Sequence, residues 1–162
     1  MLDEATLSLA ARTLSVLRAR GMTAATAESC TGGLVAASLT HHAGSSDVVL
    51  GGFVAYSNDL KHRLLDVEQE LLDRAGAVSE PVALAMATGA LHRSGASCAV
   101  SITGIAGPGG GSAEKPVGLV WFATACAGRE PRAVRCFFAG SRAVIRREAT
   151  GTALGLLEHC AG

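Results

Sequence analysis

A serine and a cysteine stand side by side in the segment AESCTGG, directly after a short apolar stretch. Ser29 and Cys30 are both candidate nucleophiles, and Thr31, Gly32 and Gly33 complete the segment. A strand-to-helix junction would direct backbone N–H groups toward such a side chain, and a helix N-terminus stabilises an anion. A simple helix cap by Ser29 or Thr31 explains the same residues without chemistry. Taken alone, this segment favours the cap.

A lysine in the segment YSNDLK, from Tyr56 to Lys61, supplies a candidate base. With Asn58 as the N-cap of a short helix through Leu65, Lys61 occupies the third helical position, where the positive end of the helix dipole disfavours its charge. Partial burial would also lower the pKa of Lys61. A neutral amine can take the proton of a serine hydroxyl. The non-catalytic alternative is an exposed lysine, with Tyr56 ending a core strand.

Cys30 competes with Ser29 as the nucleophile because a helix start lowers the pKa of a thiol. The sequence places no histidine as its base, since His41 and His42 lie about 15 Å along the same predicted helix at 1.5 Å per residue. Ser29 with Lys61 is therefore the favoured pair. Two roles stay open for Glu28, which either orients the lysine or caps the end of the strand.

A glycine-rich segment after a predicted buried strand favours a ligand-binding loop. It runs from Thr103 to Lys115, and its glycines are Gly104, Gly107, Gly109, Gly110 and Gly111. Backbone N–H groups of such a loop can hold a phosphate, although the pattern is neither a P-loop nor a dinucleotide-binding fingerprint. A flexible connection is the alternative, but loops of this length more often carry function.

Three cations are candidates to bind an anionic group near this loop. Lys115 lies in the loop itself, and Arg142 and Arg146 are four residues apart, so they share one face of the last predicted helix. The arginine pair suits a phosphate or carboxylate, and a solvated basic face paired with Glu148 is the alternative. The acidic residues show no metal-ligand spacing, and we expect neither a metal nor a cofactor.

Hydrophobic periodicity predicts the elements that must position these residues. Helices are predicted over residues 3–20, 31–41, 58–65, 68–74, 79–94 and 141–159, and strands over 22–27, 47–56, 96–102, 117–125 and 133–138. This alternation predicts an α/β fold with a mixed, partly parallel sheet flanked by helices. We expect residues 1–162 to form a single domain.

The composition limits which classes of partner and which cellular compartment we expect. The 162 residues include 14 basic and 14 acidic side chains, a balance that argues against a general nucleic-acid binder. No apolar run is long enough to span a membrane, and the N-terminus lacks the basic start of a signal peptide. The five cysteines form no C-x-x-C pair, which favours reduced thiols in a cytoplasmic protein.

Five segments together resemble the CinA C-terminal domain family, which includes stand-alone nicotinamide-nucleotide amidases. They are AESCTGG, YSNDLK followed by LL, GAVSE, TGIAGPGGG followed by KPVG, and GSRAVIR, in the family's order between about Thr23 and Arg147. Two positions depart from the family's usual pattern: Asp66 stands where glycine is common, and Pro81 stands where an acidic residue is common. Neither is a proposed site residue.

The resemblance implies an α/β fold and the hydrolysis of nicotinamide mononucleotide to nicotinate mononucleotide and ammonia, in pyridine-nucleotide salvage. It implies Ser29 as the nucleophile, Lys61 and Tyr56 in the catalytic site, and Thr103 with the following loop as the ligand-binding segment. It also implies a homo-oligomer. A non-catalytic nucleotide-binding module and an amidase for another amide-bearing nucleotide are the open alternatives.

Overall fold

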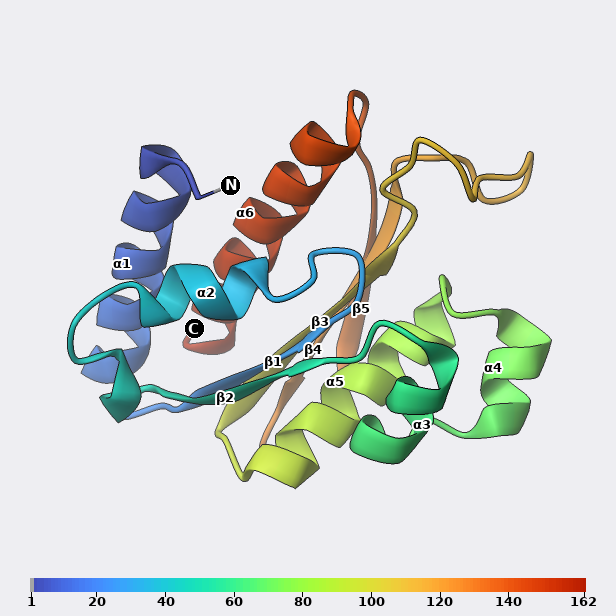
Figure 1. The fold of residues 1–162 in the computed structure, drawn as a ribbon. Helices are drawn as coiled ribbons and strands as arrows, with labels where there is room; N and C mark the ends of the chain where they lie inside the picture. Colours follow the sequence, from blue (N-terminus) through green and yellow to red (C-terminus); the bar gives the residue numbers. More distant parts are fainter. Residues whose placement is uncertain (1) are drawn as a thin grey trace.

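The computed structural model describes residues 2–162 and places one five-stranded sheet between two layers of helices (Figure 1). The strands are β1 (Ala24–Glu28), β2 (Val49–Val54), β3 (Cys98–Gly104), β4 (Leu119–Cys126) and β5 (Arg132–Phe137). The helices are α1 (Glu4–Ala19), α2 (Leu34–Thr40), α3 (Asn58–Leu65), α4 (Gln69–Ala75), α5 (Glu80–Ser94) and α6 (Arg142–Cys160), with a 3-10 turn η1 (Ser45–Asp47). The predicted α/β class and mixed sheet are confirmed.

The end of β1 lies at a topological switch point, because the connections from β1 and from β2 leave toward opposite edges of the sheet. The order is β2-β1-β3-β4-β5, with β1 parallel to β2 and β3, and with β4 antiparallel to β3 and β5. The chain leaves β1 through α2 to reach β2 on one side, and returns through α3, α4 and α5 to β3 on the other side. Ligands in open α/β sheets bind outside the carboxyl ends of strands at such a point. Ser29 directly follows β1, and Thr103 lies at the same end of β3.

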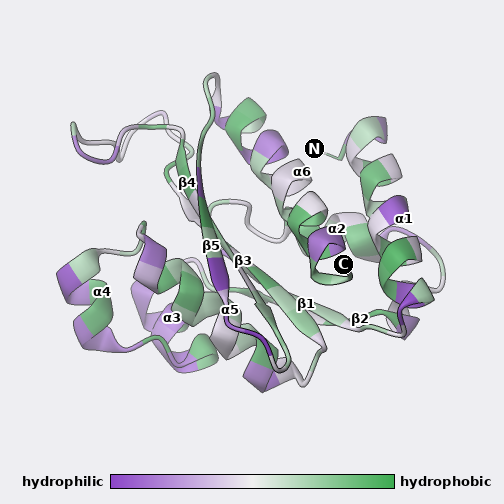
Figure 2. Cartoon of the chain, turned by 180° about the vertical axis from the view of Figure 1, so that it is seen from behind, coloured by the Kyte–Doolittle hydropathy of each residue, from purple (hydrophilic) through white to green (hydrophobic). Residues whose placement is uncertain are grey.

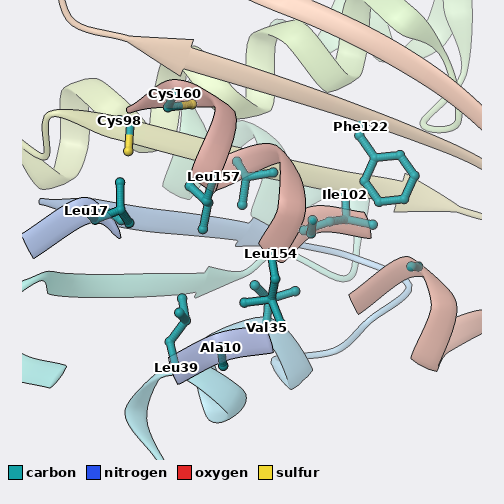
Figure 3. Packing of buried hydrophobic residues seen from close by; sticks show 14 of the residues in the cluster. Ala10, Leu17, Val35, Leu39, Cys98, Ile102, Phe122, Leu154, Leu157 and Cys160 are labelled. Atoms are coloured by element: carbon teal, nitrogen blue, oxygen red, sulfur yellow. The ribbon is translucent and has the colours of Figure 1, made fainter. Parts of the chain in front are cut away.

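Each face of the sheet has its own hydrophobic cluster. Helices α1, α2 and α6 cover one face, where Leu154 and Leu157 of α6 pack over Ile102 of β3 (Figure 3). Helices α3, α4 and α5 cover the other face around Leu65 and Met86. Hydrophilic residues gather on the outer turns of α3 and α4 (Figure 2). Within residues 2–162, no helix is long and apolar enough to cross a membrane.

Helix α2 begins later than the sequence predicts. The prediction starts the helix at Thr31, whereas the structure starts it at Leu34. Gly32 and Gly33 adopt φ values of 61° and 94°, a left-handed backbone that cannot continue into a right-handed helix and that suits glycine. The residues after Ser29 therefore form a turn, and the helix follows the turn.

Helix α3 is capped one residue earlier than predicted. Asn58 as the N-cap is wrong, because Ser57 has the extended backbone of a cap and its Oγ accepts a hydrogen bond from the N–H of Leu60 at 3.1 Å. Lys61 is therefore the fourth helical residue, and its own N–H donates to the carbonyl oxygen of Ser57 at 3.1 Å. The helix dipole has less influence at this position than the sequence argument assumed.

The position of α3 depends on a close approach to α5. A Cβ atom added at Gly89 of α5 would lie 1.9 Å from the carbonyl oxygen of Leu65, the last residue of α3. Only glycine allows this separation of the two backbones. Gly89 therefore helps to set how close α3, and Lys61 with it, lies to the sheet.

We expect Gly89→Ala to lower the free energy of unfolding by about 2 kcal/mol or more, because the methyl group overlaps the Leu65 carbonyl. Gly155→Ala, in the middle of α6, is the matched control. No atom lies within 4 Å of the Cβ position at Gly155, so alanine should stabilise the protein by about 0.5–1 kcal/mol. Urea unfolding of both variants measures the difference, and equal stabilities would contradict this account of the packing.

Candidate active site

Ser29 and Lys61 meet at the carboxyl end of β1. The Nζ atom of Lys61 lies 3.1 Å from the Oγ atom of Ser29. The lysine side chain is 1% exposed and the serine is 8% exposed. Ser29 is held by its N–H, which donates to the carbonyl oxygen of Ile102 in β3 at 2.9 Å. The sequence-predicted pair is thus in hydrogen-bond contact, although 32 residues separate the two positions.

The partners of Lys61 match those that a neutral amine needs. Its Nζ atom contacts the carbonyl oxygens of Ala55 and Tyr56 at 2.9 and 3.3 Å, in addition to Ser29. A neutral amine has two N–H groups for the two carbonyls and one lone pair that can accept the serine hydroxyl proton. Burial lowers the pKa of Lys61, and the neighbouring Cys30 thiol opposes this change. No ion pair among residues 2–162 includes Lys61.

Cys30 lies in an environment that disfavours its thiolate. The residue is 5% exposed and belongs to the hydrophobic cluster beneath α6. Burial raises the pKa of its thiol to about 11, against the opposing influence of the N–H groups of Cys30 and Thr31. The sequence argument expected a helix start to lower this pKa, and that expectation is wrong because burial has the larger effect. The thiolate is the nucleophilic form of cysteine.

A buried carboxylate, and neither Ser29 nor Thr31, caps helix α2. Glu28 is fully buried, and its oxygens accept hydrogen bonds from the N–H groups of Gly33, Val35 and Ala36 at 3.0, 3.1 and 2.8 Å. Its Oε1 atom also accepts from the Thr26 hydroxyl at 3.1 Å. An acidic group at this end of a helix is stabilised by the helix dipole. The N-cap prediction for Ser29 or Thr31 is therefore wrong.

Two backbone N–H groups of the turn, those of Cys30 and Thr31, lie near the Cys30 sulfur and have no oxygen acceptor in the described chain. Besides those that bind Glu28, the N–H of Gly32 donates to the Ser29 carbonyl at 3.0 Å, and the N–H of Leu34 reaches the Thr31 carbonyl at 3.4 Å. The amides of Cys30 and Thr31 directly follow the candidate nucleophile, and in α/β-hydrolases the N–H of the residue after the nucleophile forms part of the oxyanion hole.

Arg146 contacts the outer side of the same turn. Its Nε atom donates to the carbonyl oxygen of Cys30 at 3.1 Å, and its Nη2 atom donates to that of Thr31 at 2.8 Å. Thr31 is fully buried, and its hydroxyl has no hydrogen-bond partner within residues 2–162. Gly32 lies against this arginine, since a Cβ there would be 3.3 Å from Nη2. The guanidinium of Arg146 is therefore occupied by backbone carbonyls.

Arg142 contacts Tyr56, the residue whose carbonyl oxygen lies 3.3 Å from Lys61 Nζ. Its Nη1 atom donates to the carbonyl oxygen of Gly107 at 2.9 Å, and its Nη2 atom donates to the Tyr56 hydroxyl at 3.3 Å. Arg142 is exposed, and Tyr56 is 61% exposed. The contacts join α6, the end of β2 and the glycine loop. Of the three predicted cations, Arg142 has its guanidinium beside Tyr56.

The other members of the predicted ligand-binding segment hold the loop in place. The Nζ atom of Lys115 donates to the Ala75 carbonyl at 2.7 Å, and the Thr103 hydroxyl donates to the Ala77 carbonyl at 2.8 Å. Gly104 is the last residue of β3, where a Cβ would lie 2.7 Å from a methyl group of Val120. The two polar contacts attach the loop and the end of β3 to the last residue of α4 and to the segment that follows it.

The tip of the glycine loop is exposed. Gly109 and Gly110 belong to an exposed run from residue 108 to 114, and the loop projects beyond the ends of β3 and β4 as an arm (Figure 1). Gly107 is buried at the base of this arm, with φ 73°. The loop therefore contributes Gly107 to the contacts around Arg142, and Gly109 and Gly110 lie farther out along the exposed tip.

A separate cavity of about 440 Å³ lies between β4, β5 and the C-terminal end of α6. It is lined by Cys126 and Cys160 among others. In the sheet register, Cys126 of β4 lies opposite Cys98, the first residue of β3. This end of the sheet is the one opposite to Ser29. The cavity is thus distinct from the Ser29 site.

The sequence argument missed the backbone groups that complete the site. The carbonyl oxygens of Ala55 and Tyr56 hold Lys61, and that of Ile102 holds Ser29. Every residue has a main-chain carbonyl, so the residue types do not show which carbonyls accept these hydrogen bonds. Of the features that were missed, only the cap by Ser57 could have been read from the sequence. Serine is as common an N-cap residue as asparagine, so Ser57 was as good a candidate as Asn58.

The chain is similar to known proteins in both sequence and fold. The chain is 52% identical over 157 residues to the nicotinamide-nucleotide amidohydrolase PncC of Escherichia coli, covering 97% of this chain and 95% of that protein. A CinA-like protein of Mycolicibacterium vanbaalenii is 56% identical over 139 residues, which are 33% of its length. The structure matches the competence/damage inducible protein CihA of Agrobacterium tumefaciens with a TM-score of 0.96 and 47% identity, over 100% of this chain and 99% of that one.

A family model, the CinA C-terminal domain, matches residues 6–161. This range contains both members of the Ser29–Lys61 pair and all the residues that contact the turn after β1. The chain therefore belongs to the CinA C-terminal domain family.

Proposed function

We propose that the protein is a nicotinamide-nucleotide amidohydrolase that converts nicotinamide mononucleotide to nicotinate mononucleotide and ammonia through an acyl-enzyme on Ser29. The observation that carries this proposal is the 3.1 Å contact between Ser29 and a lysine that is 1% exposed and lacks a carboxylate partner in the described chain. The name of the E. coli relative supports the substrate class.

The chemistry begins with a proton transfer from Ser29 to Lys61. Neutral Lys61 accepts the hydroxyl proton while the serine oxygen attacks the carboxamide carbon. The resulting oxyanion is held by the N–H groups of Cys30 and Thr31, the two amides of the turn that have no oxygen acceptor in the described chain. The protonated Lys61 then gives its proton to the departing amine, and ammonia leaves.

The second half of the reaction uses the same groups. Water attacks the ester on Ser29, Lys61 takes a proton from this water, and collapse of the second tetrahedral intermediate returns the proton to the serine oxygen. Nicotinate mononucleotide is released. No step requires a group beyond those that surround Ser29.

The substrate phosphate is assigned to Arg142. All three cations donate to backbone carbonyls. Lys115 and Arg146 are half-buried, whereas Arg142 is exposed and its Nη2 atom lies beside the Tyr56 hydroxyl. The Tyr56 side chain is exposed beside Arg142, while its carbonyl oxygen contacts Lys61 Nζ. Glu28 and Thr31 are fully buried, and their role is to hold the turn.

The wider setting is also proposed. The chain acts as one domain over residues 1–162, in the cytoplasm, where its five cysteines stay reduced; none is disulfide-bonded in the structure of residues 2–162. It forms a homo-oligomer, as the family resemblance implies, and sedimentation equilibrium would measure its mass. We propose neither nucleic acid nor a membrane as a partner; the net charge of zero argues against a general nucleic-acid binder.

Replacing Ser29 with alanine should lower ammonia release from the mononucleotide by more than about 10³-fold, because the acyl-enzyme cannot form. Cys30→Ala is the matched control, and it should keep most of the activity because the thiol is buried and uncharged. A coupled ammonia assay with a panel of amide-bearing nucleotides measures both variants. Near-normal activity of the serine variant would transfer the nucleophile role to Cys30. Tight binding of the mononucleotide without turnover by the wild type would indicate a binding module.

The pH profile should report the protonation of Lys61. Burial lowers its pKa from the ordinary lysine value of 10.5, and the protonated form cannot accept a proton from Ser29. We therefore expect kcat/KM to fall as the pH decreases through this lowered pKa, and to level off above it. Lys61→Arg should remove both the activity and this acidic limb. An unchanged profile in residual activity of that variant would assign the base to another group.

Arg142→Met should weaken binding of the nucleotide through its phosphate. Loss of a charge-assisted hydrogen bond of about 1.5–3 kcal/mol predicts a rise in KM of roughly 10- to 100-fold for the mononucleotide. Nicotinamide riboside, which lacks the phosphate, is the control substrate, and its kcat/KM should be unaffected. Equal losses for both substrates would show that Arg142 does not bind the phosphate.

A further inference from the structure

We infer that Arg146 is a positioning residue, whose guanidinium holds the turn after Ser29 and orients the Thr31 N–H group, one of the two that stabilise the oxyanion. This inference rests on the proposed function, because the oxyanion forms only when Ser29 attacks a carbonyl. Arg146 contacts the turn from α6, more than a hundred residues along the chain. Nothing in its contacts places it against the substrate.

The guanidinium binds two consecutive carbonyl oxygens. The Nε–H group donates to Cys30 O at 3.1 Å, and an Nη2–H group donates to Thr31 O at 2.8 Å. The planar fork of arginine presents these donors in fixed directions. A lysine has a single nitrogen and would not span both oxygens in the same geometry. The arginine therefore defines the orientation of both peptide groups.

The direction of a carbonyl fixes the direction of the following N–H. In a trans peptide the C=O and N–H bonds point in opposite directions in one plane. Holding the Cys30 carbonyl toward α6 therefore directs the N–H of Thr31 away from α6. Holding the Thr31 carbonyl directs the N–H of Gly32 in the same manner, and this N–H donates to Ser29 O at 3.0 Å. Arg146 thus closes the turn and orients one of its two available amides.

The charge of Arg146 also strengthens this amide as a donor. A cation that hydrogen-bonds a carbonyl polarises the whole peptide group, and the N–H on its other side becomes a better donor. No carboxylate pairs with Arg146 among the ion pairs of residues 2–162. Its charge is therefore directed at the turn. The neighbouring Arg147 differs, because it is exposed and pairs with Glu148 at 2.9 Å.

The test compares Arg146→Met and Arg146→Lys with Arg147→Met, a control on the same helix that removes the same charge. We expect Arg146→Met to lower kcat by about 10²-fold, the effect of a misplacement near 1 Å, with KM and the inhibition constant of nicotinate mononucleotide unchanged. Arg146→Lys should fall between wild type and Arg146→Met. Arg147→Met should match wild type. A role in folding alone would lower the melting temperature without this selective loss of kcat.

Two results would overturn the inference. One is a kcat of Arg146→Met equal to that of Arg147→Met. The other is a raised KM and product inhibition constant with kcat retained, which would make Arg146 a substrate-binding residue. If the methionine variant does not fold, the lysine variant, which keeps the charge, carries the same comparison.

Failure of the proposed function can be told apart from failure of this inference. A wild-type protein that releases no ammonia from any nucleotide overturns the proposed function. The rate at which a fluorophosphonate labels Ser29 then replaces kcat, because its phosphoryl oxygen requires the same N–H groups. Slower labelling of Arg146→Met than of Arg147→Met supports the inference, and equal rates overturn it.

Discussion

The burial of one uncompensated amine is the constraint on which the site depends. Lys61 is 1% exposed and has two carbonyl oxygens and one hydroxyl as partners, with no carboxylate among the ion pairs of residues 2–162. Removing an ammonium from water is costly, so the protein lowers its pKa instead. The neutral form then satisfies every partner. The close packing at Gly89 and the cap at Ser57 have their importance here, because together they hold α3 where its lysine reaches Ser29.

The turn after β1 separates the amides that bind Glu28 from the two amides that have no oxygen acceptor in the described chain. The first N–H groups of a helix are the usual source of anion stabilisation at such a junction, but here Glu28 accepts from three of them. The helix start is therefore already neutralised by a buried carboxylate. What is left for an oxyanion is the pair of amides between Ser29 and Gly32. Their directions depend on the turn itself, which Arg146 contacts through the carbonyl oxygens of Cys30 and Thr31.

The sequence predicted the elements better than it predicted their ends. Hydrophobic periodicity is local, so α1, α5, α6 and the strands were found, and the motif resemblance located Ser29 and Lys61. The start of α2 was misplaced because its capping group is Glu28, a residue that precedes the turn instead of standing at the N-cap. The roles of Lys115 and Arg146 could not be predicted, since their carbonyl partners lie 40 and more than 100 residues away.

The sheet explains how Glu28 can stand next to Ser29 without forming an ion pair with Lys61. Side chains alternate along β1, so Glu28 points to the face covered by α2 and α6, together with Thr26. Lys61 approaches from α3, on the opposite face (Figure 1). A direct ion pair with Glu28 would stabilise the ammonium and raise the pKa of Lys61, and the neutral amine required for proton transfer would be lost. Burial is instead the dominant influence on that pKa. The order glutamate, then serine, at the end of β1 places the carboxylate beneath one face and leaves the hydroxyl at the edge, where the lysine of the other layer can reach it.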